Sequence, residues 1–170
     1  MITADRQLTF AELAARAESL ARMLRQWGIG EGRVVAARSS SPSLIGALAY
    51  AVPRLGGILF PLNPALSPEW LAALLGQSGA EWVIVEGDVA PVLPDGCRRL
   101  EAAAVAQCWE SAPQPAVQTR SETADEEAIE LIIATSGSAG EPKGVMLSGG
   151  NLAASAAASR AGRAAASTSS

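Results

Sequence analysis

The sequence predicts an α/β fold with a largely parallel sheet and helices packed on its faces. Three observations predict it: apolar runs of strand length alternate with segments whose leucines recur at helical spacing, serine-proline pairs open helices, and glycines close them. The connections between these segments are short. Short strand–helix–strand units in one sheet form right-handed crossovers between parallel strands, so we expect helices to cover the sheet.

The first helix is expected to begin at Thr9, which forms a capping box with Glu12. Leu8 and Leu13 occupy the positions of a hydrophobic staple around this cap. The apolar residues that recur at helical spacing are Leu13, Ala17, Leu20, Leu24 and Trp27. The glycines that follow this run end the helix.

Three strands and two helices are expected next. In chain order these are a strand at 33–37, a helix opened by Ser41 and Pro42, a strand at 58–61, a helix opened by Ser67 and Pro68, and a strand at 82–85. Serine followed by proline supplies an N-cap oxygen and then a residue with a helical φ and no N–H to satisfy. Gly56 and Gly57 end the first of these helices, and Gly76 or Gly79 ends the second.

Beyond residue 86 the pattern weakens. Residues 86–128 contain scattered prolines and the acidic stretch TRSETADEE, so we expect an exposed connection with a short strand or helix near 98–107. A buried strand at 129–134, a short strand at 145–147 and an Ala-rich helix from Asn151 follow. The chain thus divides into an α/β part at 1–152 and a tail at 153–170. The tail has no large apolar side chain to bury, so we expect it to fray beyond about residue 160.

Composition excludes several functional classes. There are 13 Lys and Arg against 17 Asp and Glu, a net charge of −4, and the basic residues form no run, so nucleic acid is not an expected partner. The start of the chain lacks a secretory pattern and no run of about 18 apolar residues occurs, so we expect a cytoplasmic protein without a membrane span. There is no histidine, and Cys97 and Cys108 are the only cysteines. A zinc site, a disulfide framework and histidine-dependent catalytic triads are therefore excluded.

The segment 135–144, TSGSAGEPKG, follows the last long apolar strand. A turn rich in Gly, Ser and Thr exposes several N–H and hydroxyl donors in one concavity, and its glycines allow the close approach that a phosphate needs. Lys143 adds a positive charge. The Walker pattern does not fit, because Glu141 and Pro142 precede the lysine and Gly144 stands where Ser or Thr would bind magnesium. The residue types leave two interpretations open, a phosphate-binding loop or a glycine-rich hairpin between two strands.

The order of residues in this loop, followed by VMLSGGNL, closely resembles the signature loop of the adenylate-forming superfamily. Its members are acyl-CoA synthetases, aryl-CoA ligases and the adenylation domains of nonribosomal peptide synthetases. Two further segments resemble the family in the expected order, LTFAELAARAESLARMLRQWGIGEG and GGILFPLNPALSPEWL. The resemblance covers residues 8–152. It implies that the chain is a fragment of the N-terminal domain of an adenylate-forming enzyme.

The resemblance implies a role for each loop residue that matches the family pattern. The residues matching those that grip the β- and γ-phosphates of ATP are Thr135, Ser136, Ser138 and Lys143. The family's conformational glycines match Gly137, Gly140 and Gly144. The implied reaction joins a small-molecule carboxylate to ATP, with Mg²⁺, to give an acyl-adenylate and pyrophosphate, and then forms a thioester on coenzyme A or a carrier-protein thiol. No catalytic set is complete in this chain, and no metal ligand is assigned.

Two positions depart from the family pattern. Ala139 stands where the family usually has Thr, which removes one hydroxyl donor, although the backbone N–H remains. Loss of one donor to a charged group costs about 1.5–3 kcal/mol, enough to slow the reaction without abolishing binding. Gly149 stands where many acyl-CoA synthetases have a histidine.

The family's adenine pocket, ribose-binding aspartate, hinge and C-terminal lysine all come later than this loop, and none of their motifs occurs here. We therefore expect the 170-residue chain alone not to adenylate. Three explanations stay open: a natural or cloned truncation, a frame-shifted product, or one half of a split ligase. The alternative function is that of a non-catalytic phosphate-binding or oligomerising remnant. An exposed sheet edge or an uncovered face would associate with another copy, so we expect a homo-oligomer.

Overall fold

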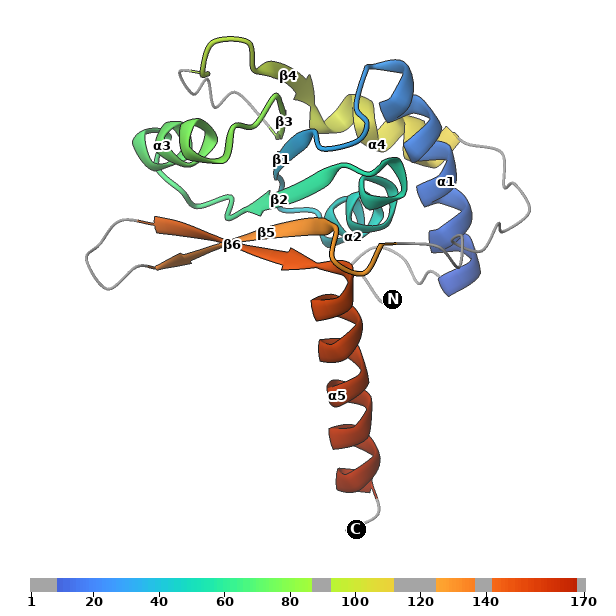
Figure 1. The fold of residues 1–170 in the computed structure, drawn as a ribbon. Coiled ribbons are helices and arrows are strands. Elements are labelled where there is room, and N and C mark those ends of the chain that lie inside the picture. Colours follow the sequence, from blue (N-terminus) through green and yellow to red (C-terminus); the bar gives the residue numbers. More distant parts are fainter. Residues whose placement is uncertain (1–8, 87–92, 112–124, 137–141, 168–170) are drawn as a thin grey trace.

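Six strands form one sheet in the order β4-β3-β1-β2-β5-β6 (Figure 1). The computed structural model describes residues 9–86, 93–111, 125–136 and 142–167. The strands are β1 (Val34–Arg38), β2 (Ile58–Leu62), β3 (Trp82–Val85), β4 (Arg98–Glu101), β5 (Ile129–Ser136) and β6 (Pro142–Ser148). All neighbouring pairs are parallel except β5–β6, which is antiparallel. The prediction of a largely parallel α/β sheet is therefore confirmed.

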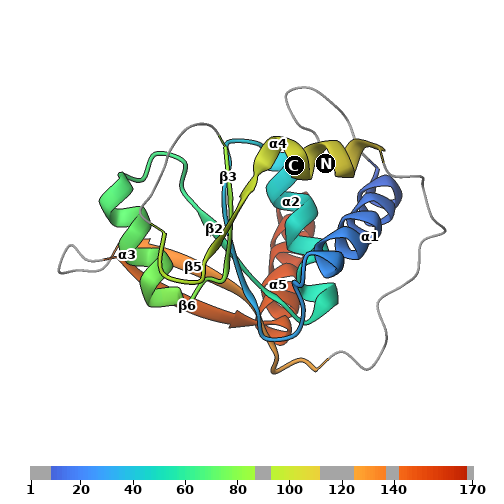
Figure 2. The ribbon, with the colours of Figure 1, turned by 90° about the horizontal axis from the view of Figure 1, so that it is seen from above.

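Helices cover both faces of this sheet. They are α1 (Phe10–Gln26), α2 (Pro42–Ala51), α3 (Pro68–Ser78), α4 (Ala102–Ser111) and α5 (Gly149–Ser167), with a 3-10 turn, η1, at Pro53–Leu55. Buried residues of α1, α2 and α4 form one core with the sheet, and buried residues of α3 form a second core on the opposite face. Figure 2 shows α3 on one side of the strands and α1, α2 and α4 on the other.

The predicted helix starts are confirmed in atomic detail. Thr9 and Glu12 form a complete capping box, in which the Glu12 N–H donates to the Thr9 hydroxyl at 3.2 Å and the Thr9 N–H donates to the Glu12 carboxylate at 2.8 Å. Ser41 caps α2 and Ser67 caps α3, each followed by the predicted proline. Helix α3 runs through Gly76 and ends at Gly79, whose φ of 64° lies in the left-handed region that glycine tolerates.

A short strand or helix is expected near 98–107, and the chain forms both β4 and α4 there. The difference from the expectation of an exposed connection is that Ala102, Val105 and Trp109 are buried. Contacts with residues distant in the sequence explain why this segment is packed against the rest of the fold. The guanidinium of Arg98 lies 5.0 Å from the ring centroid of Trp82, and that of Arg16 lies 5.5 Å from the ring centroid of Trp109. The acidic residues 125–127 are exposed, as expected, and residues 112–124 lie outside the described part.

Helix α5 projects away from the sheet (Figure 1). Its start is fixed by a reciprocal pair, in which the Ser148 N–H donates to the Asn151 side-chain oxygen at 3.1 Å and the Asn151 N–H donates to the Ser148 hydroxyl at 3.3 Å. The side chains at 153–160 are all exposed. The helix therefore depends on its own backbone rather than on packing, and fraying beyond residue 160 stays a prediction. Within the described residues, no helix has the length and apolar character needed to cross a membrane.

Gly57 gives a direct test of how tightly η1 turns into β2. A Cβ at this position would lie 3.0 Å from Cγ1 of Val52 and 3.2 Å from its carbonyl oxygen. We expect Gly57→Ala to lower the free energy of unfolding by about 1–3 kcal/mol, measured by urea denaturation. Gly76→Ala is the matched control, because a Cβ there meets no atom within 4 Å and alanine favours a helix. It should raise the stability by about 0.5–1 kcal/mol. Equal effects of the two changes would contradict the packing described here.

Candidate functional site

Parallel pairing brings the carboxyl ends of β1, β2, β3 and β5 to one edge of the sheet. The residues that follow these strands are Ser39, Asn63, Glu86 and the loop at 137–141. In open α/β sheets ligands bind outside the carboxyl ends of the strands, where successive connections leave on opposite faces. Here the chain leaves β1 through α2 and leaves β2 through α3, and these helices lie on opposite faces of the sheet. This edge is therefore the expected place for a site.

The predicted phosphate loop joins the two strands of the β5–β6 hairpin. Thr135 pairs with Lys143 and Ser136 pairs with Pro142, so only residues 137–141 separate the paired ends. Residues directly opposite each other in an antiparallel pair project from the same face. The Thr135 hydroxyl also donates to the Lys143 carbonyl at 3.3 Å. Two of the predicted phosphate-binding residues, Thr135 and Lys143, therefore lie together at the end of the hairpin.

The structure describes only some of the remaining predicted site residues. Ser136 is the last residue of β5. Gly137, Ser138 and Gly140 lie outside the described residues, as do the departure at Ala139 and Glu141. The arrangement of the loop's donors therefore stays a prediction. The structure does show the positions of the two strand ends that the loop connects.

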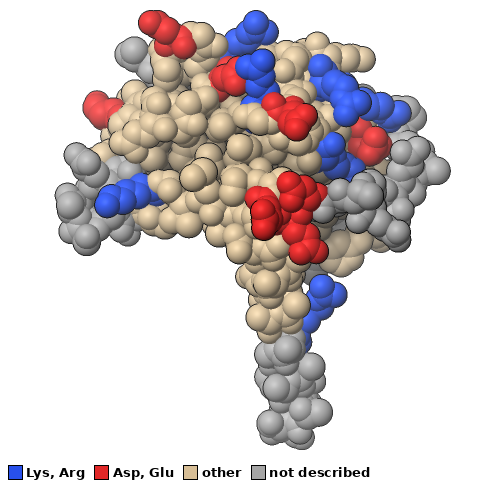
Figure 3. Space-filling model, in the orientation of Figure 1, with Lys and Arg blue, Asp and Glu red and all other residues tan. Residues whose placement is uncertain are grey.

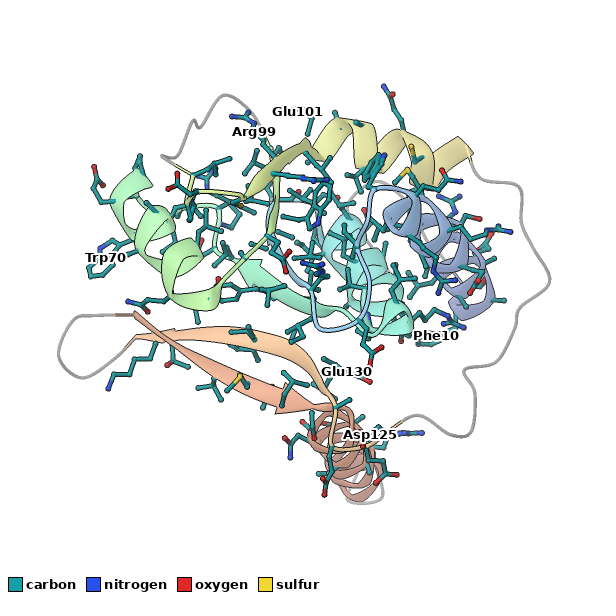
Figure 4. The ribbon with its side chains drawn as sticks, turned by 45° about the horizontal axis from the view of Figure 1, so that its top comes forward. Phe10, Trp70, Arg99, Glu101, Asp125 and Glu130 are labelled. Atoms are coloured by element: carbon teal, nitrogen blue, oxygen red, sulfur yellow. The ribbon has the colours of Figure 1, made fainter. Side chains whose placement is uncertain are left out.

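Lys143 is the only lysine in the sequence. Its side chain is exposed, and among the described residues no carboxylate lies within 4.0 Å of its ammonium group. The exposed acidic residues at 125–127 lie where α5 joins the sheet, at the other end of the hairpin (Figures 3 and 4). A cation without a carboxylate partner can pair with an anionic ligand without first breaking an ion pair.

Gly144 has a packing role that the sequence does not reveal. The family pattern makes it a conformational glycine, but it lies in strand β6 and is not among the glycines with positive φ. A Cβ at this position would lie 3.0 Å from Cγ2 of Ile132. The hairpin here borders a groove of about 420 Å³ that is also lined by residues of α3. Its lining residues are Phe60, Leu74, Gln77, Ser78, Ile132, Lys143, Gly144 and Met146.

A second polar cluster at the same edge is absent from the sequence-based predictions. The Glu86 carboxylate accepts hydrogen bonds from the Ser40 N–H at 2.7 Å, the Ser40 hydroxyl at 2.8 Å and the Ser39 hydroxyl at 3.1 Å. The bonds from Ser40 lower the pKa of Glu86 most, and Ser39 and the charge of Arg38 lower it further. The cluster joins the end of β3 to the turn that opens α2. Its signal in the sequence is a pair of serines after one strand and a carboxylate after another.

Gly149, the second departure from the family pattern, is the first residue of α5. The Gly149 N–H donates to the Ala128 carbonyl at 3.1 Å. A Cβ on the adjacent Gly150 would lie 3.1 Å from the carbonyl oxygen of Glu126. The lack of a side chain at Gly150 thus lets the helix start close to the segment that leads into β5.

No group of three or more Cys, Asp and Glu side chains within the described ranges could hold a metal ion. That the chain as a whole supplies no metal ligand stays a prediction. Cys97 and Cys108 are both free thiols, and burial raises the pKa of the Cys97 thiol.

Comparisons with known proteins point to one family. The family described as AMP-binding enzyme matches residues 1–169. Tyrocidine synthase 3 of Brevibacillus parabrevis is 33% identical over 155 residues, which make up 86% of this chain and 2% of that protein. The long-chain-fatty-acid–CoA ligase FadD13 of Mycobacterium tuberculosis is 31% identical over 149 residues, which make up 84% of this chain and 30% of that protein.

A solved structure agrees with these sequence matches. The inhibitor-bound N-terminal domain of FACL13 from Mycobacterium tuberculosis superposes with a TM-score of 0.71 at 26% identity, over 85% of this chain and 38% of that chain. The chain thus spans less than a third of the length of either curated relative. The mixed, mostly parallel sheet with flanking helices is the fold of this N-terminal region.

The Glu86 cluster predicts a specific acid sensitivity. Because hydrogen bonds stabilise the carboxylate in the folded state, its pKa is lower there than in the unfolded chain. Its contribution to stability is therefore complete above the ordinary glutamate pKa and is lost as the pH falls through the folded-state value. Urea unfolding at a series of acidic pH values should show a shallower loss of stability for Glu86→Gln than for the wild type. Glu127→Gln, at an exposed position of the acidic segment, is the control and should follow the wild type.

Proposed function

The chain belongs to the AMP-binding enzyme family, and from this premise we propose that it is the loop-bearing N-terminal portion of an ATP-dependent, AMP-forming ligase. The proposed ligase joins a small-molecule carboxylate to coenzyme A or to a carrier-protein thiol. Within this chain the proposed activity is to grip the phosphates of ATP. The observation that carries the proposal is the pairing of Thr135 with Lys143 directly beside the loop TSGSAGEPKG.

The geometry of the strand ends supports phosphate binding in three ways. The hairpin opens at the carboxyl edge of the parallel strands, where α/β folds bind their ligands. The hydroxyl of Thr135 and the ammonium of Lys143 project from the same face of the hairpin. Lys143 is exposed and has no carboxylate partner among the described residues. An anion could therefore reach both groups from solvent without first displacing an ion pair.

The proposed chemistry places electrostatic demands on the loop. When a carboxylate oxygen attacks the α-phosphorus of ATP, the bond to the bridging oxygen breaks and pyrophosphate leaves with increasing negative charge. Donors already in place next to that charge stabilise the transition state more than the ground state. We propose that Lys143 supplies the positive charge and that Thr135, Ser136 and Ser138 supply hydroxyl donors. The glycines Gly137 and Gly140 would let the backbone approach the phosphates. None of these groups has to act as a base.

The described residues fit a magnesium ion that is bound mainly by the phosphates of the nucleotide rather than by protein carboxylates. Protein-bound Mg²⁺ keeps several waters and takes one or two carboxylates together with phosphate oxygens. The described residues offer hydroxyls and one ammonium group at the hairpin but no carboxylate cluster. We therefore propose that Mg²⁺ would be held mainly by the phosphates of ATP, that its charge would offset theirs, and that Ser or Thr hydroxyls of this loop would be its nearest protein groups.

The names of the relatives leave the thiol acceptor open. One relative is a CoA ligase and another is a tyrocidine synthase. The same phosphate-binding loop would serve a ligase that uses either coenzyme A or a carrier protein, because the proposed first step forms an acyl-adenylate in both cases. The proposal therefore commits to ATP and a carboxylate, and it includes coenzyme A and carrier-protein thiols as the two acceptor classes.

Lys143→Ala tests the proposal most directly. Removing a charged partner of phosphate costs about 1.5–3 kcal/mol, so the dissociation constants for pyrophosphate and for ATP should rise by about tenfold to a hundredfold in titration calorimetry. Lys143→Arg should retain part of the affinity, because it keeps the charge. Arg25→Ala removes an exposed cation on α1, far along the chain from the loop, and should leave binding unchanged.

The outcomes separate the competing functions. Because Lys143 is the only lysine, acylation of its amine can be followed by mass spectrometry, and pyrophosphate should protect it. Binding and protection without carboxylate-dependent pyrophosphate exchange would assign the chain as a phosphate-binding module. Exchange activity would show that it also carries out the first chemical step. No binding of pyrophosphate by the wild type at millimolar concentrations would contradict the phosphate loop.

Ala139→Thr makes a separate prediction, because it restores the hydroxyl that the family pattern has at this position. An added donor to a charged phosphate should tighten pyrophosphate binding by about tenfold. Ala139→Val is the matched control, since valine has the shape of threonine without the hydroxyl. Equal affinities of the two variants would show that position 139 does not donate to phosphate.

A further inference from the structure

Ile132 lies at the point where the β5–β6 hairpin joins the parallel sheet. The residue before it, Leu131, pairs with Leu59 of β2. Ile132 is 7% exposed and belongs to the core cluster that includes the buried residues of α3. A β-branched side chain has a restricted χ1 angle, so its γ carbons are held in place. Ile132 is therefore a fixed point of the hairpin, and its burial comes from described residues alone.

Ile132 also reaches across the hairpin to strand β6. Met146 pairs with Ile132 and Gly144 pairs with Ala134, so Ile132 and Gly144 are diagonal neighbours on one face. A Cβ at position 144 would lie 3.0 Å from Cγ2 of Ile132, which is closer than the 3.5–4.0 Å at which carbon atoms ordinarily pack. Gly144 is not among the glycines with positive φ, so alanine can adopt its backbone conformation. What the glycine provides is the close contact between Ile132 and the backbone of β6.

This contact is next to Lys143 in strand β6. Lys143 pairs with Thr135, and the side chains of this pair project from the face opposite to Ile132. The Thr135 hydroxyl donates to the Lys143 carbonyl at 3.3 Å. Strand β6 is therefore held from both faces within two consecutive residues. A group that separated Ile132 from β6 would move Lys143 relative to Thr135.

We propose that Ile132 is a positioning residue for Lys143 and that it acts through its contact with β6 at Gly144. This role rests on the proposed binding of phosphate by Lys143. Ile132 does not itself face the ligand, because its side chain lies on the core face of the hairpin. Groups that bind a ligand must be held within about 0.5 Å of their productive positions, so a small displacement of β6 is enough to weaken phosphate binding.

A double-mutant cycle between positions 132 and 144 tests the contact. Gly144→Ala should raise the dissociation constant for pyrophosphate by roughly tenfold in titration calorimetry, a usual size for coupling between residues in contact. Adding Ile132→Leu removes the Cγ2 branch and should recover most of the lost affinity. Adding Ile132→Val is the matched control, because valine keeps both γ carbons and should not recover it.

The same two changes should rank in the opposite order when Gly144 is retained. Ile132→Val keeps the γ carbon that contacts β6, whereas Ile132→Leu removes it, so the leucine variant should bind pyrophosphate more weakly than the valine variant. This comparison also decides the proposal if Gly144→Ala does not fold. A role in stability alone would leave the affinity of the folded variants independent of which residues are paired at 132 and 144. Equal affinities of the leucine and valine variants in each background would overturn the proposal.

A structural measurement separates this inference from the proposed function. Because Lys143 is the only lysine, labelling with nitrogen-15 lysine gives one backbone amide signal. The nuclear Overhauser effect between this amide and the protons of Thr135 should weaken in Gly144→Ala, and it should return with Ile132→Leu but not with Ile132→Val. If the wild-type chain does not bind pyrophosphate, the proposed function fails, and this comparison still decides whether Ile132 positions Lys143. An unchanged Overhauser effect in Gly144→Ala would contradict the positioning role.

Discussion

Burial of the parallel sheet on both faces is the constraint on which the rest of the structure depends. A parallel sheet needs helices on each side, and its strands must then be apolar along their whole length rather than on alternate residues. Val35, Ala36 and Ala37 of β1 are fully buried, as are Val83, Ile84 and Val85 of β3. Because β1 and β3 pair in register along their length, the connections that leave them meet at one edge. The Glu86 cluster and the hairpin loop both belong to that edge.

The hairpin that carries the candidate site departs from this rule. Strands β1 and β2 pair over five residues, whereas β5 pairs with β2 only at Leu59 and Leu131. Strand β5 nevertheless lies against β2, and β6 contacts both α3 and α5. Ile132 of β5 is buried in the core beneath α3. The predicted phosphate loop therefore begins from a hairpin that is anchored to the parallel sheet through β5.

The sequence predicts the features that are set by local chemistry. The caps at Thr9, Ser41 and Ser67 depend on side chains three residues from their partners, so spacing alone identifies them. Helix α4 depends instead on contacts between residues far apart in the chain, such as Arg16 with Trp109. The role of Glu86 escapes prediction for the same reason, because its partner Ser40 lies 46 residues earlier. In the site, the motif identifies Lys143, but only the register reveals that Thr135 faces it.

The two faces of the β5–β6 hairpin serve different purposes. The side chains of Thr135 and Lys143 belong to one face, at the end from which the proposed phosphate loop begins. Ile132 and Gly144 belong to the opposite face, where Ile132 is buried against the core beneath α3. The lack of a side chain at Gly144 lets Ile132 approach. The same two strands can therefore pack against the core with one face and hold the loop residues with the other.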